Sequence, residues 1–376
     1  MESKNTIVKY YKKHSLNFSI KTISSPPKKS YNFFVVIPAY DEYDFIFNTL
    51  DSINSASFIA FNTLLVIIVV NNTNKDSKQI KENNHKTYQL INKTQYAYDH
   101  VAIDCYSASN ALKQKYSGVG FARKVGMDYA LQYSFKKSII FSLDADTLID
   151  ARYFEFIIND FQNFNIEGCT INFKHQKSND TIIEDGIRKY EKKLKEIAFK
   201  MNKTGSPYGY VSMGSAMAFT AQAYIKVGGM PNKKATEDFY YLQALAKYTH
   251  IHQIKKILVY PSSRNQQRVY LGTGYRINEY KENLKFINLS YSLKSYENLK
   301  IILKTVDNMW DKDYSSIVKS LSVKCDEKTI LFLEKNNFKA RWDNFGKETK
   351  NKKQFLLFFN QWFDALKTIK FLKNLS

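Results

Sequence analysis

Short apolar runs, each ending in polar residues or a proline, alternate with amphipathic stretches over the first half of the chain. Residues 31–38 and 64–70 are apolar almost throughout, which is typical of strands buried on both faces of a parallel sheet. Residues 44–54 between them have helical spacing, with an inward side expected to consist of Phe45, Thr49, Leu50 and Ile53. Strand, helix and strand at this spacing predict a βαβ unit with a right-handed crossover.

A third apolar run, residues 138–143, ends in two aspartates one residue apart. In extended chain, residues i and i+2 point to the same side, so the carboxylates of Asp144 and Asp146 would converge on one target. They would lie at the carboxyl end of the strand, where open α/β sheets bind their ligands. Two carboxylates there suit a hard divalent cation that also carries phosphate oxygens. A solvated loop that happens to hold two aspartates is the alternative.

The same alternation continues through the middle of the chain, and the last hundred residues are helical. Further helices and strands are expected over residues 118–133, 169–173, 181–201, 221–227, 239–248 and 257–260. From Ile277 onward the apolar spacing is helical throughout. We therefore predict a basic N-terminal arm (1–30), an α/β domain (31–276) with a mostly parallel twisted sheet flanked by helices, and an all-helical C-terminal extension (277–376).

The chain carries a formal net charge of +21, which on its own suggests a nucleic-acid-binding protein. Only seven of its 56 basic residues are arginines, however, and no run combines arginine with aromatic residues. Proteins that read grooves or clamp phosphates favour arginine for its planar fork, so we expect no nucleic-acid partner. Attraction to an anionic substrate or to an anionic membrane surface is the other interpretation of the charge.

Cysteine usage and hydropathy bear on the cellular compartment. The three cysteines (Cys105, Cys169 and Cys325) are too far apart for a zinc site and odd in number for a disulfide framework. The first residues contain no apolar signal segment, and the longest apolar run, residues 64–70, is far shorter than the roughly 20 residues that span a bilayer. These features lead us to expect a cytoplasmic protein.

An aromatic stripe in the C-terminal extension adds a membrane hypothesis. The stripe lies beside Lys352 and Lys353 and consists of Phe355, Phe358, Phe359, Trp362 and Phe363. Basic residues next to such a stripe are typical of a helix that lies in a membrane interface, which would place the protein at the inner face of the membrane. The alternative is that the stripe is ordinary core.

Several short motifs occur in order along residues 31–275. They are Val36-Ile37-Pro38-Ala39-Tyr40-Asp41-Glu42, a second strand with a polar end (64–76), Ala122-Arg123, Asp144-Ala145-Asp146, Gly228-Gly229 and Glu237-Asp238. No single motif is specific, but the ordered set resembles the family 2 glycosyltransferases with the GT-A fold. The likeness does not extend to the last hundred residues.

The resemblance implies a binding site for a nucleotide-diphosphate sugar, with the base and ribose on the loops after the first two strands. The residues implied in that site are Pro38, Ala39, Tyr40, Glu42, Asn71, Arg123, Asp144, Ala145, Gly214 and Arg268. Asp146 and Asp144 are the implied ligands of Mg²⁺ or Mn²⁺. Both are hard cations, and carboxylate oxygens bind either one, so the ligands do not indicate which cation is used. A surface ion pair is the alternative role for Arg123.

Two positions depart from the family pattern. Asn71 and Asn72 stand where family members usually carry an aspartate pair, which leaves the identity of the base open. Arg268 is followed by Val269 and Tyr270, unlike the Q-x-x-R-W motif of the processive synthases, which disfavours processive polymerisation.

The resemblance also implies a general base. Asp238 would take the proton of an acceptor hydroxyl as it attacks the anomeric carbon from the face opposite the leaving group. Glu237 would either position the acceptor or favour the helix N-terminus, and a helix cap is the alternative role for Asp238.

The implied function is a metal-dependent, inverting glycosyltransferase. It would move one sugar from a nucleotide-diphosphate donor to a hydroxyl of a glycan or lipid-linked glycan, in surface polysaccharide or glycolipid assembly. A nucleotidyltransferase also binds a nucleotide and a carboxylate-held metal, but it would carry a glycine-rich phosphate loop after the first strand. A basic nucleic-acid-binding protein is the alternative from another class.

Overall fold

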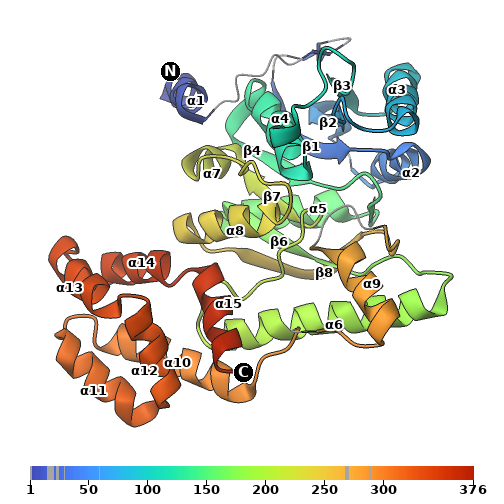
Figure 1. Cartoon of the computed structure of the whole chain (residues 1–376). Helices are drawn as coiled ribbons and strands as arrows, with labels where there is room; N and C mark the ends of the chain where they lie inside the picture. Colours follow the sequence, from blue (N-terminus) through green and yellow to red (C-terminus); the bar gives the residue numbers. More distant parts are fainter. Residues whose placement is uncertain are drawn as a thin grey trace. The chain divides into compact units, whose positions relative to one another are not determined.

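Eight strands form one mixed sheet in the computed structural model, which describes residues 2–14, 21–22, 25–28, 30–58, 60–266, 271–287 and 289–376. The strands are β1 (Tyr31–Ala39), β2 (Leu64–Asn71), β3 (Asp99–Cys105), β4 (Ser134–Ser142), β5 (Leu148–Ile149), β6 (Gly168–Phe173), β7 (Met217–Thr220) and β8 (His252–Tyr260). Their order in the sheet is β3-β2-β1-β4-β7-β6-β8-β5 (Figure 1).

Most of the pairing is parallel. Strands β1 to β4 pair in parallel, as do β6 and β8, whereas β7 runs antiparallel to β4 and β6, and β5 antiparallel to β8. All eight residues of β2 are buried, as its uninterrupted apolar run predicts for a strand covered on both faces. The predicted fold class, a mostly parallel sheet flanked by helices with a helical C-terminal part, is confirmed.

The register of the parallel strands brings three polar strand ends to one edge of the sheet. Val36 of β1 aligns with both Ile67 of β2 and Ser142 of β4. The loops that follow Ala39, Asn71 and Ser142 therefore leave the sheet on the same side, which is the ligand-binding edge of open α/β sheets.

The chain forms two units. The first takes Met1–Ile187 and Ser212–Glu282, and the second takes Arg188–Val211 and Asn283–Ser376. The first unit contains the sheet and the helices α1 (Glu2–His14), α2 (Tyr43–Asn54), α3 (Lys78–Lys93), α4 (Val119–Leu131), α5 (Tyr153–Phe164), α7 (Ala221–Lys226), α8 (Glu237–Tyr248) and most of α9 (Thr273–Asn283). Helix α6 (Thr181–Lys203) begins in the first unit and ends in the second.

Helices cover both faces of the parallel strands. Helices α2 and α3 lie on one side of β1 and β2, and α4 lies on the other (Figure 1). In α2 the buried side is Ile46, Thr49, Leu50 and Ile53. The prediction that Phe45 points inward is wrong: this residue is 37% exposed, whereas Ile46, one helical turn before Leu50, is fully buried.

The residues before β1 contain structure that the sequence pattern did not predict. Helix α1 occupies part of the expected N-terminal arm. Thr22 forms an antiparallel bridge with Ile103 of β3, and the backbone N–H of Asp104 donates to the carbonyl of Lys21 at 2.9 Å. Strand β3 stands at the end of the sheet order, so this segment lies along a sheet edge.

The second unit is helical, as expected for the C-terminal region. Its further helices are α10 (Leu293–Asn308), α11 (Tyr314–Lys324), α12 (Glu327–Lys335), α13 (Phe338–Glu348), α14 (Lys352–Trp362) and α15 (Ala365–Asn374). Most of them start at a side-chain cap that accepts from a backbone N–H three residues on, the caps being Ser292, Asp313, Asp326, Asn351 and Asp364.

The aromatic stripe of α14 is part of the core of the second unit. Phe355, Phe359 and Phe363 are each 1% exposed. The Phe355 ring lies 4.8 Å from that of Trp342, measured between centroids. Three of the five residues of the stripe are therefore core, as the alternative predicts, whereas Phe358 and Trp362 are partly exposed. Across the described residues, no helix combines the length and the apolar content needed to cross a bilayer.

Candidate functional site

The site in the first unit is built around a buried arginine. Arg123 lies in the first turns of α4 and is 2% exposed. Its Nη1 group donates to the carboxylate of Glu237, at the start of α8, and its Nη2 group donates to Asp144, after β4. Among the described residues, its Nε group has no hydrogen-bond partner. Arg123 therefore joins two of the predicted site carboxylates, Asp144 and Glu237, which come from distant parts of the sequence.

Glycines allow α4 and its neighbours to approach so closely. Gly118 has φ +149°, a backbone conformation that favours glycine. A Cβ on Gly120 would lie 2.5 Å from the carbonyl oxygen of Lys233 and 2.8 Å from the Cβ of Glu237. A Cβ on Gly214 would collide with the guanidinium of Arg123. Gly214, which was predicted to contact the nucleotide sugar, thus leaves the space that the Arg123 guanidinium occupies.

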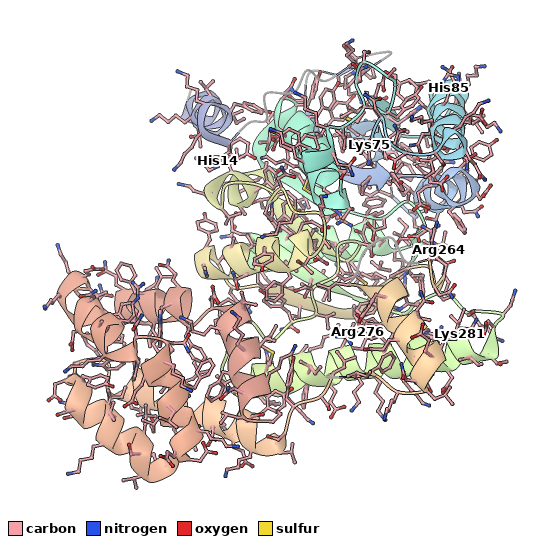
Figure 2. The ribbon with its side chains drawn as sticks, in the orientation of Figure 1. His14, Lys75, His85, Arg264, Arg276 and Lys281 are labelled. Atoms are coloured by element: carbon pink, nitrogen blue, oxygen red, sulfur yellow. The ribbon has the colours of Figure 1, made fainter. Side chains whose placement is uncertain are left out.

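A second arginine joins the other two carboxylates of the site. The Nε group of Arg264, on the loop after β8, lies 2.8 Å from the carboxylate of Asp146, and its Nη2 group donates to Glu42. Its guanidinium carbon lies 4.3 Å from the ring centroid of Phe45, which explains why that ring faces outward. Figure 2 labels Arg264 near the start of α9. Arg268, the predicted residue of this loop, lies outside the described residues.

Asp238 has the surroundings of a proton acceptor. It is the second residue of α8, and Thr236, with φ +61°, occupies the N-cap position. Its Oδ1 atom accepts from the backbone N–H of Phe239 at 2.7 Å. Burial raises the pKa of the Asp238 carboxyl above its usual value; the charge of Arg123 opposes this rise and that of Asp144 adds to it. A carboxylate with a raised pKa is a stronger base than an ordinary aspartate.

The neighbouring Glu237 has a different role. It is 3% exposed, and its carboxylate is paired with Arg123. Because that pair holds the start of α8 against the start of α4, Glu237 fixes the position from which the Asp238 side chain projects. The two roles predicted for Glu237 from the sequence were positioning the acceptor and favouring the helix N-terminus. Its pairing with Arg123 was not predicted.

The loops after β1 and β2 are joined by an asparagine that the sequence analysis missed. Asn84, in α3, is fully buried; its Nδ2 group donates to the carbonyl of Asn71 at 3.0 Å and to Oδ1 of Asn72 at 2.9 Å. Its Oδ1 accepts from the N–H of Asp41 at 3.0 Å. Helical periodicity could have indicated that Asn84 is buried, because it shares a helical face with the buried Thr87, Tyr88 and Ile91.

The remaining predicted residues lie at the same edge. Tyr40 donates its hydroxyl to Asp76 at 3.1 Å. Asn71 is 4% exposed, and its Oδ1 atom has no hydrogen-bond partner in the described part of the chain. Pro38 and Ala39 end β1, and the carbonyl of the buried Ala145 accepts from Thr49 at 2.9 Å. The edge therefore carries a buried, unsatisfied acceptor on β2, opposite which a ligand donor could bind.

Acidic side chains outnumber basic ones at this edge. Five carboxyl side chains lie at this edge with two arginines, Arg123 and Arg264, so these seven side chains together carry an excess of three negative charges when all are ionised; the five are Glu42, Asp144, Asp146, Glu237 and Asp238. No three His, Cys, Asp or Glu side chains of the described residues are arranged to hold a metal by themselves. Asp144 and Asp146, 36% and 17% exposed, are the carboxylates open to a cation that brings phosphate oxygens with it.

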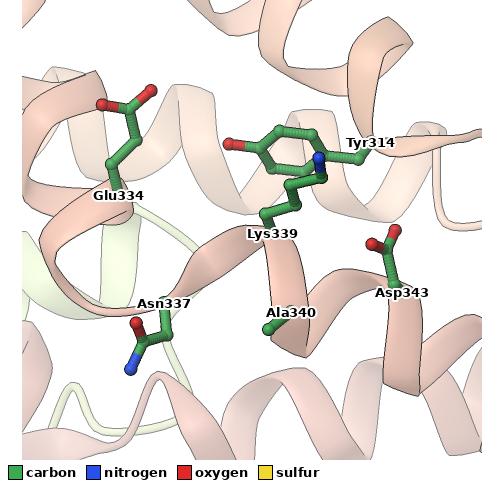
Figure 3. Close-up of a pocket in the computed structure, with 6 residues that line it drawn as sticks. All are labelled: Tyr314, Glu334, Asn337, Lys339, Ala340 and Asp343. Carbon is green, nitrogen blue, oxygen red and sulfur yellow. The ribbon is translucent and has the colours of Figure 1, made fainter.

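A hollow of about 580 Å³ lies elsewhere, in the second unit (Figure 3). It is lined by Tyr314, Glu334, Asn337, Lys339, Ala340 and Asp343. None of the predicted site residues lines it, and those that the structure describes belong to the first unit.

The comparisons with known proteins find structural likeness only. No family model matches the sequence, and no curated protein matches it. The structure of S. aureus TarS residues 1–349 with UDP-GlcNAc is 11% identical, with a TM-score of 0.47, over 88% of this chain and 91% of that one. The mannosyltransferase PcManGT from Pyrobaculum calidifontis, with GDP-Man and Mn²⁺, is 10% identical, with a TM-score of 0.43, over 96% and 95%. At these TM-scores the likeness says nothing about the chemistry of this chain.

Proposed function

We propose that the first unit is a metal-dependent, inverting glycosyltransferase that uses a nucleotide-diphosphate sugar. The observation that carries the proposal is the Arg123 bridge. It joins Asp144, at the edge where a cation and diphosphate would bind, to Glu237, the residue before a carboxyl with a raised pKa. Sugar transfer needs these two features next to each other: a place for the leaving diphosphate and a base for the incoming hydroxyl.

The donor would lie along the carboxyl ends of β1, β2 and β4. The unsatisfied Oδ1 of Asn71 suits a hydrogen-bond donor on the base, and the loop from Pro38 to Glu42 would contact the base and ribose. Asp146 and Asp144 would hold Mg²⁺ or Mn²⁺ at the diphosphate. When bound, the cation offsets the negative charge that develops on the departing nucleotide diphosphate.

Asp238 would act on the acceptor, for which we propose a hydroxyl of a glycan or lipid-linked glycan in surface polysaccharide or glycolipid assembly. The acceptor oxygen forms its bond to the anomeric carbon as the bond from that carbon to the diphosphate oxygen breaks. The proton of the hydroxyl passes to the Asp238 carboxylate, and the electron pair of the broken bond leaves with the nucleotide diphosphate. A single displacement of this kind inverts the anomeric carbon.

The test is a panel of nucleotide-diphosphate sugars, each with and without Mn²⁺, followed by thermal unfolding. UDP-GlcNAc and GDP-mannose are the first probes. A bound donor at 100 times its Kd stabilises the folded protein by about 2.7 kcal/mol, which is visible as a rise in Tm. The anomeric configuration of the product, read by NMR, then tests inversion. A protein whose Tm responds to no donor, with or without the cation, would refute the proposal.

A further inference from the structure

A second polar cluster lies along the middle and second half of α4, where four buried side chains from three helices meet. Asp128 of α4 accepts at Oδ1 from the hydroxyls of Tyr10 in α1, at 2.7 Å, and Tyr224 in α7, at 2.9 Å. Lys124 lies 3.0 Å from the Oδ2 atom of Asp128 and donates to the Tyr10 hydroxyl at 2.8 Å. None of the four residues is more than 6% exposed.

This cluster is an unusual way to attach a surface helix. Burial raises the pKa of Asp128, and burial together with the Asp128 charge raises that of Tyr10 well above its usual value, so the tyrosines remain hydrogen-bond donors. An apolar contact would attach α1 without taking charges out of water. Unlike an apolar contact, a buried cluster whose polar groups are all hydrogen-bonded also holds each of its side chains in a defined position.

The members of the cluster also hold the turn that follows α7. Gly228 and Gly229 have φ +86° and +77°, and a Cβ on Gly229 would collide with the Tyr10 hydroxyl. The backbone of Met230 hydrogen-bonds to the Tyr224 hydroxyl, and the N–H of Gly229 donates to the Tyr224 carbonyl at 2.9 Å. Tyr10 and Tyr224 therefore contact successive residues of one turn.

The chain runs directly from this turn to the proposed base. The carbonyls of Pro231 and Lys233 lie against Gly120, at 3.0 and 2.5 Å from where its Cβ would stand, and Glu237 follows. Helix α4 thus carries both the cluster and Arg123, which directly precedes Lys124. Figure 2 labels His14 at the end of α1 beside α7, where its ring stacks on that of Tyr10 at 5.4 Å.

We propose that α1 is a positioning element for the start of α8, acting through Tyr10 and Asp128. The inference rests on the proposed function, because the group it positions is the Asp238 carboxylate. The Tyr10 hydroxyl fixes the Gly229 turn, the turn fixes the segment up to Glu237, and Asp238 projects from there. No member of this chain of contacts lies after β1 or β2, and it meets the donor edge only at β4, through the pairing of Glu237 with Arg123 and of Arg123 with Asp144. A loss of the Tyr10 contact should therefore affect kcat more than donor affinity.

The experiment compares Tyr10→Phe with Tyr11→Phe. Both tyrosines lie in α1 and both donate to Asp128, but Tyr11 donates to its backbone carbonyl and only Tyr10 contacts Gly229. The three measurements are donor Kd, transfer kcat at saturating donor, and hydrogen exchange of the backbone amides of residues 229–237. Tyr10→Phe is expected to speed exchange in this segment and to lower kcat by about 10- to 100-fold, the usual effect of a small misplacement, with a much smaller change in donor Kd. Tyr11→Phe is expected to change neither exchange nor kcat.

The outcomes separate the two proposals. Equal exchange and equal kcat in the two variants would overturn the positioning role of Tyr10, and so would a loss of donor affinity equal to the loss of kcat. Asp128→Asn, which keeps the side-chain shape, is the second variant and is expected to act in the same direction as Tyr10→Phe. If the unmodified protein transfers no sugar, the proposed function fails, and the exchange comparison still decides whether Tyr10 holds the turn.

Discussion

The Arg123 bridge predicts a specific pattern of stability in a double-mutant cycle. Arg123 and Glu237 are 3% exposed at their side chains, whereas Asp144, the other partner, is 36% exposed. The pair with Asp144 is partly screened by water and is expected to contribute at most about 1 kcal/mol. Most of the effect of removing Arg123 therefore comes from Glu237, which would be left buried and uncompensated.

The magnitudes follow from this burial. Arg123→Met is expected to lower the free energy of unfolding by about 3–5 kcal/mol, the usual result of breaking a buried ion pair from one side. Glu237→Gln leaves Arg123 paired with Asp144 and is expected to lose only about 1–3 kcal/mol. The double variant buries no unpaired charge, so it should be at least about 1 kcal/mol more stable than the sum of the two single losses implies.

The assay is urea unfolding at pH 7, followed by a probe that reports on the first unit. Arg152→Met is the matched control, since Arg152 is 53% exposed and lies 3.9 Å from Asp150. It is expected to change the stability by no more than about 0.5 kcal/mol. If the losses of the two single variants simply add in the double variant, the buried pairing is not what stabilises this region and the reasoning fails.

Four further predictions concern the site. Asp146→Ala is expected to abolish Mn²⁺-dependent donor binding in calorimetry, and unchanged Mn²⁺ dependence would contradict the metal assignment. Asp238→Asn should keep donor affinity and lower kcat by about two to four orders of magnitude. In the unmodified protein, kcat should fall on acidification at a pH above 3.8, the ordinary pKa of aspartate. The reason is that the raised pKa of Asp238 lets this carboxylate take up a proton at a higher pH than an ordinary aspartate does. A fall that begins only below that value would exclude Asp238 as the base. Asn84→Ala should weaken nucleotide binding by about tenfold through the loss of hydrogen bonds between two loops, whereas Asn92→Ala, on the same helix, should not.

The sequence allowed the sheet and its ligand edge to be predicted because both depend on local patterns. The apolar runs of β1, β2 and β4 are continuous, and each ends where polar residues begin, so Asp144 and Asp146 could be placed at a strand end without knowing what they contact. The helices of the second unit follow from apolar spacing and capping residues in the same way.

What could not be predicted depends on contacts between distant residues. The carboxylates that pair with Arg123 and Arg264 come from other elements, and a short motif does not indicate which carboxylate an arginine will pair with. In the sequence, Gly214 is equally consistent with a flexible loop and with close packing against Arg123, and only the structure shows that the two residues are in contact. Helix α1 is polar apart from a few side chains, and the buried Tyr10 that attaches it cannot be told from an exposed tyrosine by periodicity.

The short bridge between Thr22 and Ile103 has a consequence for how the protein is shortened. The motifs begin at residue 31, which makes the start of β1 the natural place to cut. Such a cut would remove the pairing of residues 21–22 and leave the backbone of β3 open along the outer side of the sheet. Unpaired edge strands recruit strands from other molecules. A protein trimmed to residue 31 should therefore keep the residues of its site and still self-associate, and charged substitutions along β3 would be the way to recover a monodisperse sample.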